Sequence, residues 1–417
     1  MDLWGAGWLV LAFVLFPFGY KPIVALMSIS AIFQASKIIT LAGVNLPLFF
    51  CMELITILRL SIPYKNNNFL SLKTKKFFYI FVFILLIYLQ TFFSTSLFNG
   101  IKVYSAENSF EDNYMLGGDF LRFTSSNINQ LVLITVNLIL MYCLYVRGSY
   151  LSKEFYLKTI FYSFFIFFIV SIIWYLYKDF YLILSNFLLN NDNYSITSIY
   201  ENRLSATFSE PSFAGLFIGS LFLPTLLYRN NKKVLIFLCL CFLSLLNMSG
   251  TLIFSALISF ILFFLFITKN NMYRLIFVIL SFLFGILIYF IVFNLLDTYI
   301  FEKKSSISGI VRYDSNLFAI NNLIQSYFVG VGVGSLRVSS LIINLFASFG
   351  IFLTIVLLFL IHNFIRFKGS NSDKVSLFML LVCFVGSWSS IPDYSLAILW
   401  NLIFLNVIPS GEDCKNN

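Results

Sequence analysis

The fold of this chain is decided by stretches such as Phe161-Tyr162-Ser163-Phe164-Phe165-Ile166-Phe167-Phe168. Similar apolar runs recur along the 417 residues, of which 60% are hydrophobic, 11% are charged and 53 are phenylalanine. A soluble domain is about 45–50% apolar and about 25% charged, so it could not bury this much apolar surface, whereas a lipid bilayer can. Because the runs lack the two-residue alternation of barrel strands, the sequence predicts an all-α integral membrane protein.

Working outward from this stretch gives the number of membrane spans. A helix needs about 20 apolar residues to cross a bilayer, and twelve or thirteen segments qualify, all within one transmembrane domain of residues 1–417. We interpret the first as a retained membrane anchor, because no small-residue cleavage site of a secretory signal is visible. The candidate spans are 3–19, 22–40, 44–62, 77–97, 127–146, 156–177, 211–229, 234–248, 251–268, 275–294, 341–365, 375–391 and 394–409.

The positions of the basic residues predict the orientation of these spans. Lysine and arginine fall in every second connection, and those connections are nearly free of acidic residues, so the positive-inside rule places them in the cytoplasm. The net charge of +9 is explained by this pattern and does not indicate nucleic-acid binding. The residues concerned are Lys65, Lys73, Lys75, Lys76, Arg147, Lys153, Lys158, Arg229, Lys232, Lys233, Lys269, Arg274, Arg366, Lys368 and Lys374.

The other connections then face outward, and three of them are long: about 98–126, 178–210 and 295–340. They also hold most of the acidic residues. Functional residues concentrate in loops that a rigid scaffold positions. We therefore expect the working surface on the outer, periplasmic side of a bacterial inner membrane.

A first candidate site lies in the segment from Glu201 to Gly215, which leads into an apolar helix. Pro211 suits a first helical turn, and a helix N-terminus attracts anions. Arg203 adds a planar, permanently charged donor group that suits phosphate, and Glu210 is a carboxylate close to it in sequence. The alternative is an interfacial arginine beside an ordinary helix cap.

A second candidate site begins at Arg312-Tyr313-Asp314-Ser315-Asn316 and continues to Gly330-Val331-Gly332-Val333-Gly334 and Arg337. Alternating glycines allow a backbone to approach a ligand closely or to enter a tight turn. The run follows no predicted strand and opens no Rossmann helix, so a dinucleotide site is excluded. A glycine-rich hinge that re-enters the membrane is the alternative.

Four further features are candidates or exclusions. Arg122, after Gly117-Gly118-Asp119, either binds substrate or belongs to the polar top of a helix. Ser249 lies in a predicted tight turn and could line a cavity. Glu53 is a carboxylate in an apolar segment, which is either functional or interfacial. His362 is the only histidine and is predicted near the cytoplasm, which excludes a Ser/His/Asp triad or a histidine zinc site on the outer face.

The order of these features resembles the Wzy-type O-antigen polymerases, within the wider family of polymerases and ligases that act on lipid-linked glycans. The resemblance rests on Arg203 to Gly215, on Ser249, on Arg312 with the glycine run, and on Asn344 and Gly350, and it covers about 200–352. Members of the family have an arginine in each of two long periplasmic loops, often with a glycine some ten residues later. Arg203 precedes Gly215 by twelve positions, but Arg312 has no glycine until Gly330.

The resemblance implies a GT-C-like membrane glycosyltransferase whose donor is a glycan on undecaprenyl pyrophosphate. The glycan passes onto the terminal sugar of a lipid-linked repeat unit, and a chain-length regulator is an expected partner besides membrane lipid. The pyrophosphate gains charge as it leaves, so fixed arginines stabilise the transition state without a metal or other cofactor. We expect Arg203 and Arg312 to be catalytic with Glu210 and Asp314 as candidate bases, and the substrate to be bound by Arg122, Arg337, Gly332, Gly334, Ser249 and Asn344.

Two alternatives belong to other kinds of protein. The related ligase transfers finished glycan to lipid A–core, but its family carries a periplasmic histidine where this sequence offers Asn344. A flippase or other transporter of lipid-linked sugars needs access from both sides and usually a charged central cavity. Here the charges concentrate in the outer loops, which favours the polymerase.

Overall fold

The computed structural model describes residues 3–41, 44–62, 74–108, 110–148, 151–191, 203–228, 232–267, 307–389 and 391–410. This part of the chain is mostly helical, and its strands form two short antiparallel pairs. The elements are α1 (Leu3–Leu15), η1 (Phe16–Phe18), α2 (Tyr20–Ser30), β1 (Lys37–Leu41), β2 (Val44–Pro47), α3 (Leu48–Ser61), α4 (Thr74–Leu97), β3 (Lys102–Val103), α5 (Phe110–Leu116), β4 (Asp119–Phe120), α6 (Ser125–Arg147), α7 (Lys153–Leu176), α8 (Lys178–Leu188), α9 (Pro211–Phe222), α10 (Pro224–Leu227), α11 (Lys233–Asn247), α12 (Gly250–Ile267), α14 (Ile307–Gln325), α15 (Leu341–Phe364), α16 (Asn371–Gly386) and α17 (Ala397–Val407).

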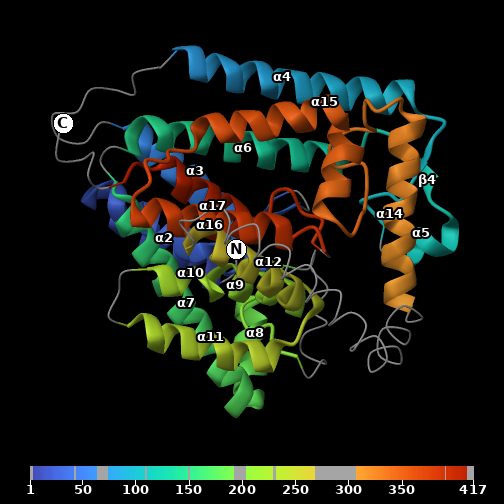
Figure 1. The fold of residues 1–417 in the computed structure, drawn as a ribbon. Helices are drawn as coiled ribbons and strands as arrows, with labels where there is room; N and C mark the ends of the chain where they lie inside the picture. Colours follow the sequence, from blue (N-terminus) through green and yellow to red (C-terminus); the bar gives the residue numbers. More distant parts are fainter. Residues whose placement is uncertain are drawn as a thin grey trace.

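The helices form one body in which α4, α6 and α15 run along one another, with α14 standing across one end (Figure 1). α14 packs on α15 and α5. A second group contains α9, which packs on α11, α12 and α16. Between them, α3 contacts α6, and α16 and α17 contact each other. One large hydrophobic core runs through both groups, and two smaller buried clusters lie beside it.

Four described helices are long and apolar enough to cross a membrane: Lys75–Leu97, Ser125–Arg147, Lys153–Leu176 and Leu341–Phe364. The other predicted spans within the described residues form shorter helices, such as Lys233–Asn247 and Ala397–Val407. The predicted span 275–294 lies outside the described residues. The described part of the chain therefore shows fewer full-length spans than the twelve or thirteen that the sequence predicts.

Some predicted boundaries were wrong for local reasons. The span 22–40 ends as a helix at Ser30, and Lys37–Leu41 pairs with Val44–Pro47 instead. The run Ile38-Ile39-Thr40 is β-branched throughout, which favours an extended backbone over a helix. All three connections predicted as long loops contain a helix: α5 lies within 98–126, α8 begins 178–210, and α14 fills the middle of 295–340.

Polar side chains fix the helix ends that surround the site. Thr124 and Asn127 form a capping box at the start of α6, in which each side chain satisfies a backbone N–H of the other. The Asn127 amide also donates to the carbonyl oxygen of Val333 at 2.7 Å and to Ser335 Oγ at 2.8 Å. The same residue thus starts a helix and holds the glycine run against it.

The glycine run is packed against backbone on several sides. Gly330, Gly332 and Gly334 all have positive φ, and a Cβ on Gly334 would lie 2.7 Å from the Ser126 carbonyl oxygen. A Cβ on Gly330 would collide with the backbone nitrogen of Gly350, where α15 is kinked at a φ of 75°. The close approach that the sequence predicted was to a ligand or within a tight turn, whereas in the structure these glycines approach neighbouring protein segments.

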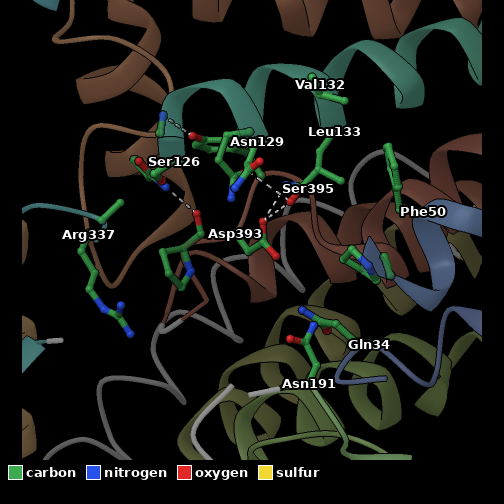
Figure 2. Close-up of a pocket in the computed structure, with 18 of the residues that line it drawn as sticks. Gln34, Phe50, Ser126, Asn129, Val132, Leu133, Asn191, Arg337, Asp393 and Ser395 are labelled. Carbon is green, nitrogen blue, oxygen red and sulfur yellow. Dashed lines mark hydrogen bonds between the residues drawn. The ribbon is translucent and has the colours of Figure 1, made fainter. Parts of the chain in front are cut away.

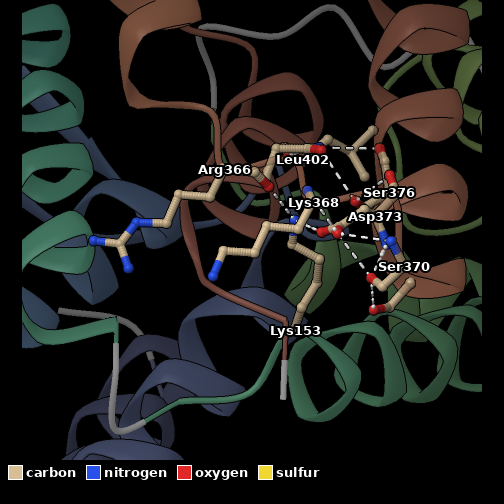
Figure 3. Close-up of polar contacts among 9 residues, drawn as sticks. Lys153, Arg366, Lys368, Ser370, Asp373, Ser376 and Leu402 are labelled. Carbon is tan, nitrogen blue, oxygen red and sulfur yellow. Dashed lines mark hydrogen bonds and ion pairs between the residues drawn. The ribbon is translucent and has the colours of Figure 1, made fainter. Parts of the chain in front are cut away.

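A buried ion pair joins α7 to α16. Lys153 Nζ lies 2.5 Å from Asp373 Oδ1, and both side chains are essentially inaccessible to solvent (Figure 3). Lys153 Nζ also donates to the Arg366 carbonyl oxygen at 2.8 Å, and Asp373 Oδ2 accepts from Ser370 Oγ at 2.8 Å. Ser370 and Asp373 form the capping box of α16, so helix start and ion pair share one carboxylate.

Candidate functional site

An open cavity of about 830 Å³ lies between the two groups of helices. Its walls come from the segment after α2, from α3, α6 and α14, from the end of the glycine run, and from the connection between α16 and α17. This volume falls in the range of about 300–1,000 Å³ that is typical of small-molecule sites. Segments more than 300 residues apart in sequence meet there, since Gln34 and Asp393 both line it.

Two arginines line the cavity from neighbouring segments. Arg312 comes from α14, and Arg337 follows the glycine run. Their backbones are tied together, because Ser339 Oγ donates to the Arg312 carbonyl oxygen at 3.4 Å. Ser315 Oγ on α14 also forms a hydrogen bond of 2.9 Å with Ser339 Oγ in the segment before α15. Two of the arginines that the sequence nominated thus share one side of the cavity, although 25 positions separate them in sequence.

Arg337 is held in place by the segment between β3 and α5. Its backbone N–H donates to the Tyr104 carbonyl oxygen at 2.7 Å, and its Nη1 donates to the Asn108 carbonyl oxygen at 3.1 Å. Burial lowers the pKa of the guanidinium, and the charge of nearby Glu210 raises it. The group stays protonated at neutral pH because the ordinary pKa of arginine lies far above it.

Glu210 also lines the cavity, at the start of α9. Ser212 Oγ donates to its Oε2 at 3.0 Å. The preceding residues are buried, and Asn247 Nδ2 donates to the carbonyl oxygens of Leu204 and Pro211 at 2.6 and 2.9 Å. The α11–α12 turn therefore positions Glu210 indirectly, by fixing the backbone on both sides of it.

Asp393 is a further carboxylate in the cavity lining. It lies on the connection between α16 and α17, and its Oδ1 accepts hydrogen bonds from the Ser395 backbone N–H at 2.8 Å and from Ser395 Oγ at 2.6 Å. Burial raises the pKa of Asp393, and the two hydrogen bonds from Ser395 oppose the rise without cancelling it. A carboxylate with a raised pKa at a cavity wall is a candidate general base.

The segment that carries Asp393 is anchored by other cavity residues. Asn344 Nδ2, on α15, donates to the Pro392 carbonyl oxygen at 2.7 Å. The Gly334 N–H donates to Tyr394 Oη at 2.7 Å, and Trp400 Nε1 donates to the Tyr394 carbonyl oxygen at 2.8 Å. Asn344 and Gly334 were expected to bind substrate. Both line the cavity, and both hold the residues that flank Asp393.

The remaining predicted site residues lie outside the cavity lining. Arg122 is exposed, with Nη2 3.8 Å from Glu107 Oε2 at the rim. Burial raises the pKa of Tyr104, and the negative charge of Asp314 raises it further. Gly332 is buried against Thr91. Ser249 accepts from the Leu252 N–H at 3.1 Å and so caps α12.

Arg203 is half-buried just before the packed segment that leads to Glu210, and it too is outside the lining. Of the ten residues nominated from sequence, the structure therefore gathers five around one cavity. These are Arg312, Arg337, Glu210, Gly334 and Asn344.

Sequence reasoning missed Asp393, Gln34 and Asn137, which all line the cavity. The polar break Ser389-Ser390-Ile391-Pro392-Asp393 between two short apolar segments was a usable signal for the first. Gln34 and Asn137 lie within segments predicted as spans, where an isolated amide carries little information. Glu53, left undecided between a functional and an interfacial role, is 1% exposed and lines the cavity.

Comparison of the chain with models of protein families, with curated proteins and with solved structures finds no match. Within the described residues, no group of three or more His, Cys, Asp or Glu side chains is placed to hold a metal ion. The function is therefore argued from the cavity itself.

Proposed function

We propose that this chain is an O-antigen polymerase, a multi-pass glycosyltransferase of the bacterial inner membrane with its site on the periplasmic side. Its donor would be a glycan on undecaprenyl pyrophosphate, and its acceptor the terminal sugar of a lipid-linked repeat unit. The observation that carries the proposal is the meeting of Arg312, Arg337 and the half-buried carboxylate of Asp393 around one cavity. Four apolar helices of spanning length support the membrane setting.

The two arginines suit a pyrophosphate leaving group. As the bond between the anomeric carbon and the phosphate oxygen breaks, negative charge develops on that oxygen, and a guanidinium fixed nearby stabilises this state more than the ground state. Arg337 is held by two hydrogen bonds from its backbone and side chain to protein carbonyl oxygens. Such preorganisation means that little reorganisation is needed during the reaction.

Asp393 suits the base that activates the acceptor. The acceptor hydroxyl oxygen forms the new bond to the anomeric carbon, its proton passes to the Asp393 carboxylate, and the bond to undecaprenyl pyrophosphate breaks with its electron pair on the phosphate oxygen. A raised pKa makes the carboxylate a stronger proton acceptor than an exposed aspartate. Glu210 is another carboxylate of the cavity lining, and its negative charge raises the pKa of Arg337.

The test is deletion of the gene in its host, with lipopolysaccharide analysed on a gel. Deletion should leave core carrying a single repeat unit, and the wild-type gene should restore the ladder. Genes that carry Arg312→Ala or Asp393→Asn should be expressed normally but should not restore the ladder, so that only core with a single repeat unit is seen. Lys102→Ala, which removes an exposed cation of β3, is the matched control and should restore the ladder.

Other patterns would assign other functions. Loss of all O-antigen on deletion refutes the polymerase. Polymer stranded on its lipid carrier would identify a ligase, which the position of His362 in the last turn of α15, away from the cavity lining, does not favour. Single repeat units stranded on the cytoplasmic side would identify a flippase.

A further inference from the structure

Three buried polar side chains line the cavity on walls that the arginines do not form. Gln34 lies just after α2, Glu53 in the middle of α3, and Asn137 halfway along α6. They are 5%, 1% and 2% exposed. We call Gln34, Glu53 and Asn137 the polar lobe. None of them belongs to the arginine and aspartate machinery described above.

The polar lobe holds hydrogen-bonding atoms that no described residue satisfies. They are Gln34 Nε2 and Oε1, Glu53 Oε1 and Asn137 Oδ1. Buried polar atoms in folded proteins are almost always paired, and each exception calls for an explanation. Because all three residues line one cavity, a ligand in that cavity is the natural partner for these atoms.

The atoms fit a neutral, hydroxyl-rich ligand. A sugar hydroxyl donates one hydrogen bond and accepts others, so it can satisfy both the acceptors of Glu53 and Asn137 and the free donor of Gln34. An ionised phosphate diester offers only acceptors, so it could not pair with the acceptor oxygens of Asn137 and Gln34. A bare divalent cation prefers six or more oxygens, whereas the lobe also presents an N–H donor. Phe49 and Phe50 contribute apolar surface to the same lining, as sugar rings require.

The place of the lobe relative to Asp393 assigns the sugar. Figure 2 shows Arg337 on one side of the cavity and Gln34 on the other, with Asp393 between them in the view. The attacking hydroxyl and the base that takes its proton lie on the side of the anomeric carbon opposite the leaving group. With the leaving group at Arg337, the acceptor sugar therefore lies on the side of the cavity where Asp393 and Gln34 are.

We propose that the polar lobe binds the terminal sugar of the acceptor repeat unit and aims its hydroxyl at Asp393. This assignment rests on the proposed function. Asn137 is 12 residues into α6, so at about 1.5 Å per residue the bound sugar reaches about 18 Å along that helix. The acceptor glycan thus enters well below the helix end that carries Asn127.

The test is a binding measurement on the purified full chain in nanodiscs, and it does not depend on turnover. The probes are the lipid-linked repeat unit extracted from the deletion strain and undecaprenyl pyrophosphate without sugar. The variants are Glu53→Gln and Asn137→Leu, with Thr56→Val as control. Thr56 is buried one turn from Glu53 on α3, bonds only to the Met52 carbonyl among the described residues, and lies outside the lining.

We expect each lobe variant, which loses a hydrogen bond to the sugar, to bind the repeat unit about tenfold more weakly or worse, a change of about 1.4 kcal/mol. Their affinity for undecaprenyl pyrophosphate and the behaviour of Thr56→Val should match wild type. If the variants lose affinity for both probes equally, or for neither probe, the assignment of the polar lobe is overturned. Binding by wild type that strengthens with Ca²⁺, and no longer does so in Glu53→Gln, overturns it in favour of a cation site.

The two proposals fail in different ways. If the polymerase is correct and the lobe is wrong, deletion gives single repeat units on the gel while the lobe variants bind both probes normally. If the polymerase is wrong, deletion gives another gel pattern whatever the variants bind. Absence of any repeat-unit binding by wild type overturns the lobe even when the gel supports polymerisation.

Discussion

The buried pair of Lys153 and Asp373 allows a prediction of stability that does not depend on function. Removing one member of a buried ion pair leaves an uncompensated charge and costs about 3–5 kcal/mol. In Asp373→Asn the ammonium keeps only the Arg366 carbonyl oxygen and an amide oxygen, and the α16 cap is weakened. We therefore expect a loss of about 5 kcal/mol for this variant.

The opposite change should cost less. In Lys153→Met the Asp373 carboxylate keeps its hydrogen bonds from Ser370 Oγ and from the backbone N–H groups of Ser370 and Lys368. We expect a loss of about 3 kcal/mol, the low end of the range for a broken buried pair. The double variant removes both charges. It should lose about 2–3 kcal/mol, mainly from the unsatisfied Arg366 carbonyl and the weakened cap.

The assay is reversible unfolding of the purified protein by SDS in mixed micelles. Lys158→Met, an exposed lysine on the same helix, is the control and should stay within about 0.5 kcal/mol of wild type. If the two single losses simply add in the double variant, the side chains are not coupled and the reasoning fails. A larger loss for Lys153→Met than for Asp373→Asn would refute the asymmetry.

Three further outcomes follow from the site and the glycine packing. Ser395→Ala removes a hydrogen bond that favours the ionised Asp393 carboxylate, so the pKa of Asp393 should rise. Because the base works only above its pKa, the acid limb of the plot of polymerisation rate against pH should move to higher pH, and an unmoved limb would exclude Asp393 as the base. Arg337→Lys keeps the charge but loses the bidentate donor group, and initial rates should fall about tenfold or more; full activity would contradict the pyrophosphate contact. Gly350→Ala places a Cβ against the Val329 carbonyl oxygen at positive φ, costs at least about 1–3 kcal/mol, and should lower the yield of folded protein in size-exclusion chromatography; a wild-type yield would mean that the kink relaxes.

The sequence predicted the long helices well because their signal is local. Lys153–Leu176 and Leu341–Phe364 lie within a few residues of the predicted 156–177 and 341–365. Their apolar length alone separates them from the polar connections. Prediction failed where a short apolar run had two outcomes of similar local preference, as at Ile38-Ile39-Thr40, which pairs as a strand.

The candidate site was predictable in kind and only partly in membership. Arg312 and Arg337 stand out because a permanent charge in an apolar chain needs a reason, and both line the cavity. Arg203 stands out equally in sequence and does not line it. The difference lies in contacts between distant segments, such as that of Ser339 with Arg312, which no local pattern encodes. Asp393 follows a polar break that is visible in the sequence, but its place at the cavity depends on distant contacts, those of Asn344 with Pro392 and of Gly334 with Tyr394.

The contact between Gly330 and Gly350 has a consequence for descent. A side chain on either glycine would collide with the backbone beside the other. Neither glycine can therefore be replaced while the backbone of the other segment keeps its present conformation. Substitutions at the two positions should therefore be correlated, although 19 other residues separate them. Descendants of this chain should keep both glycines, or should lose both together along with the kink in α15.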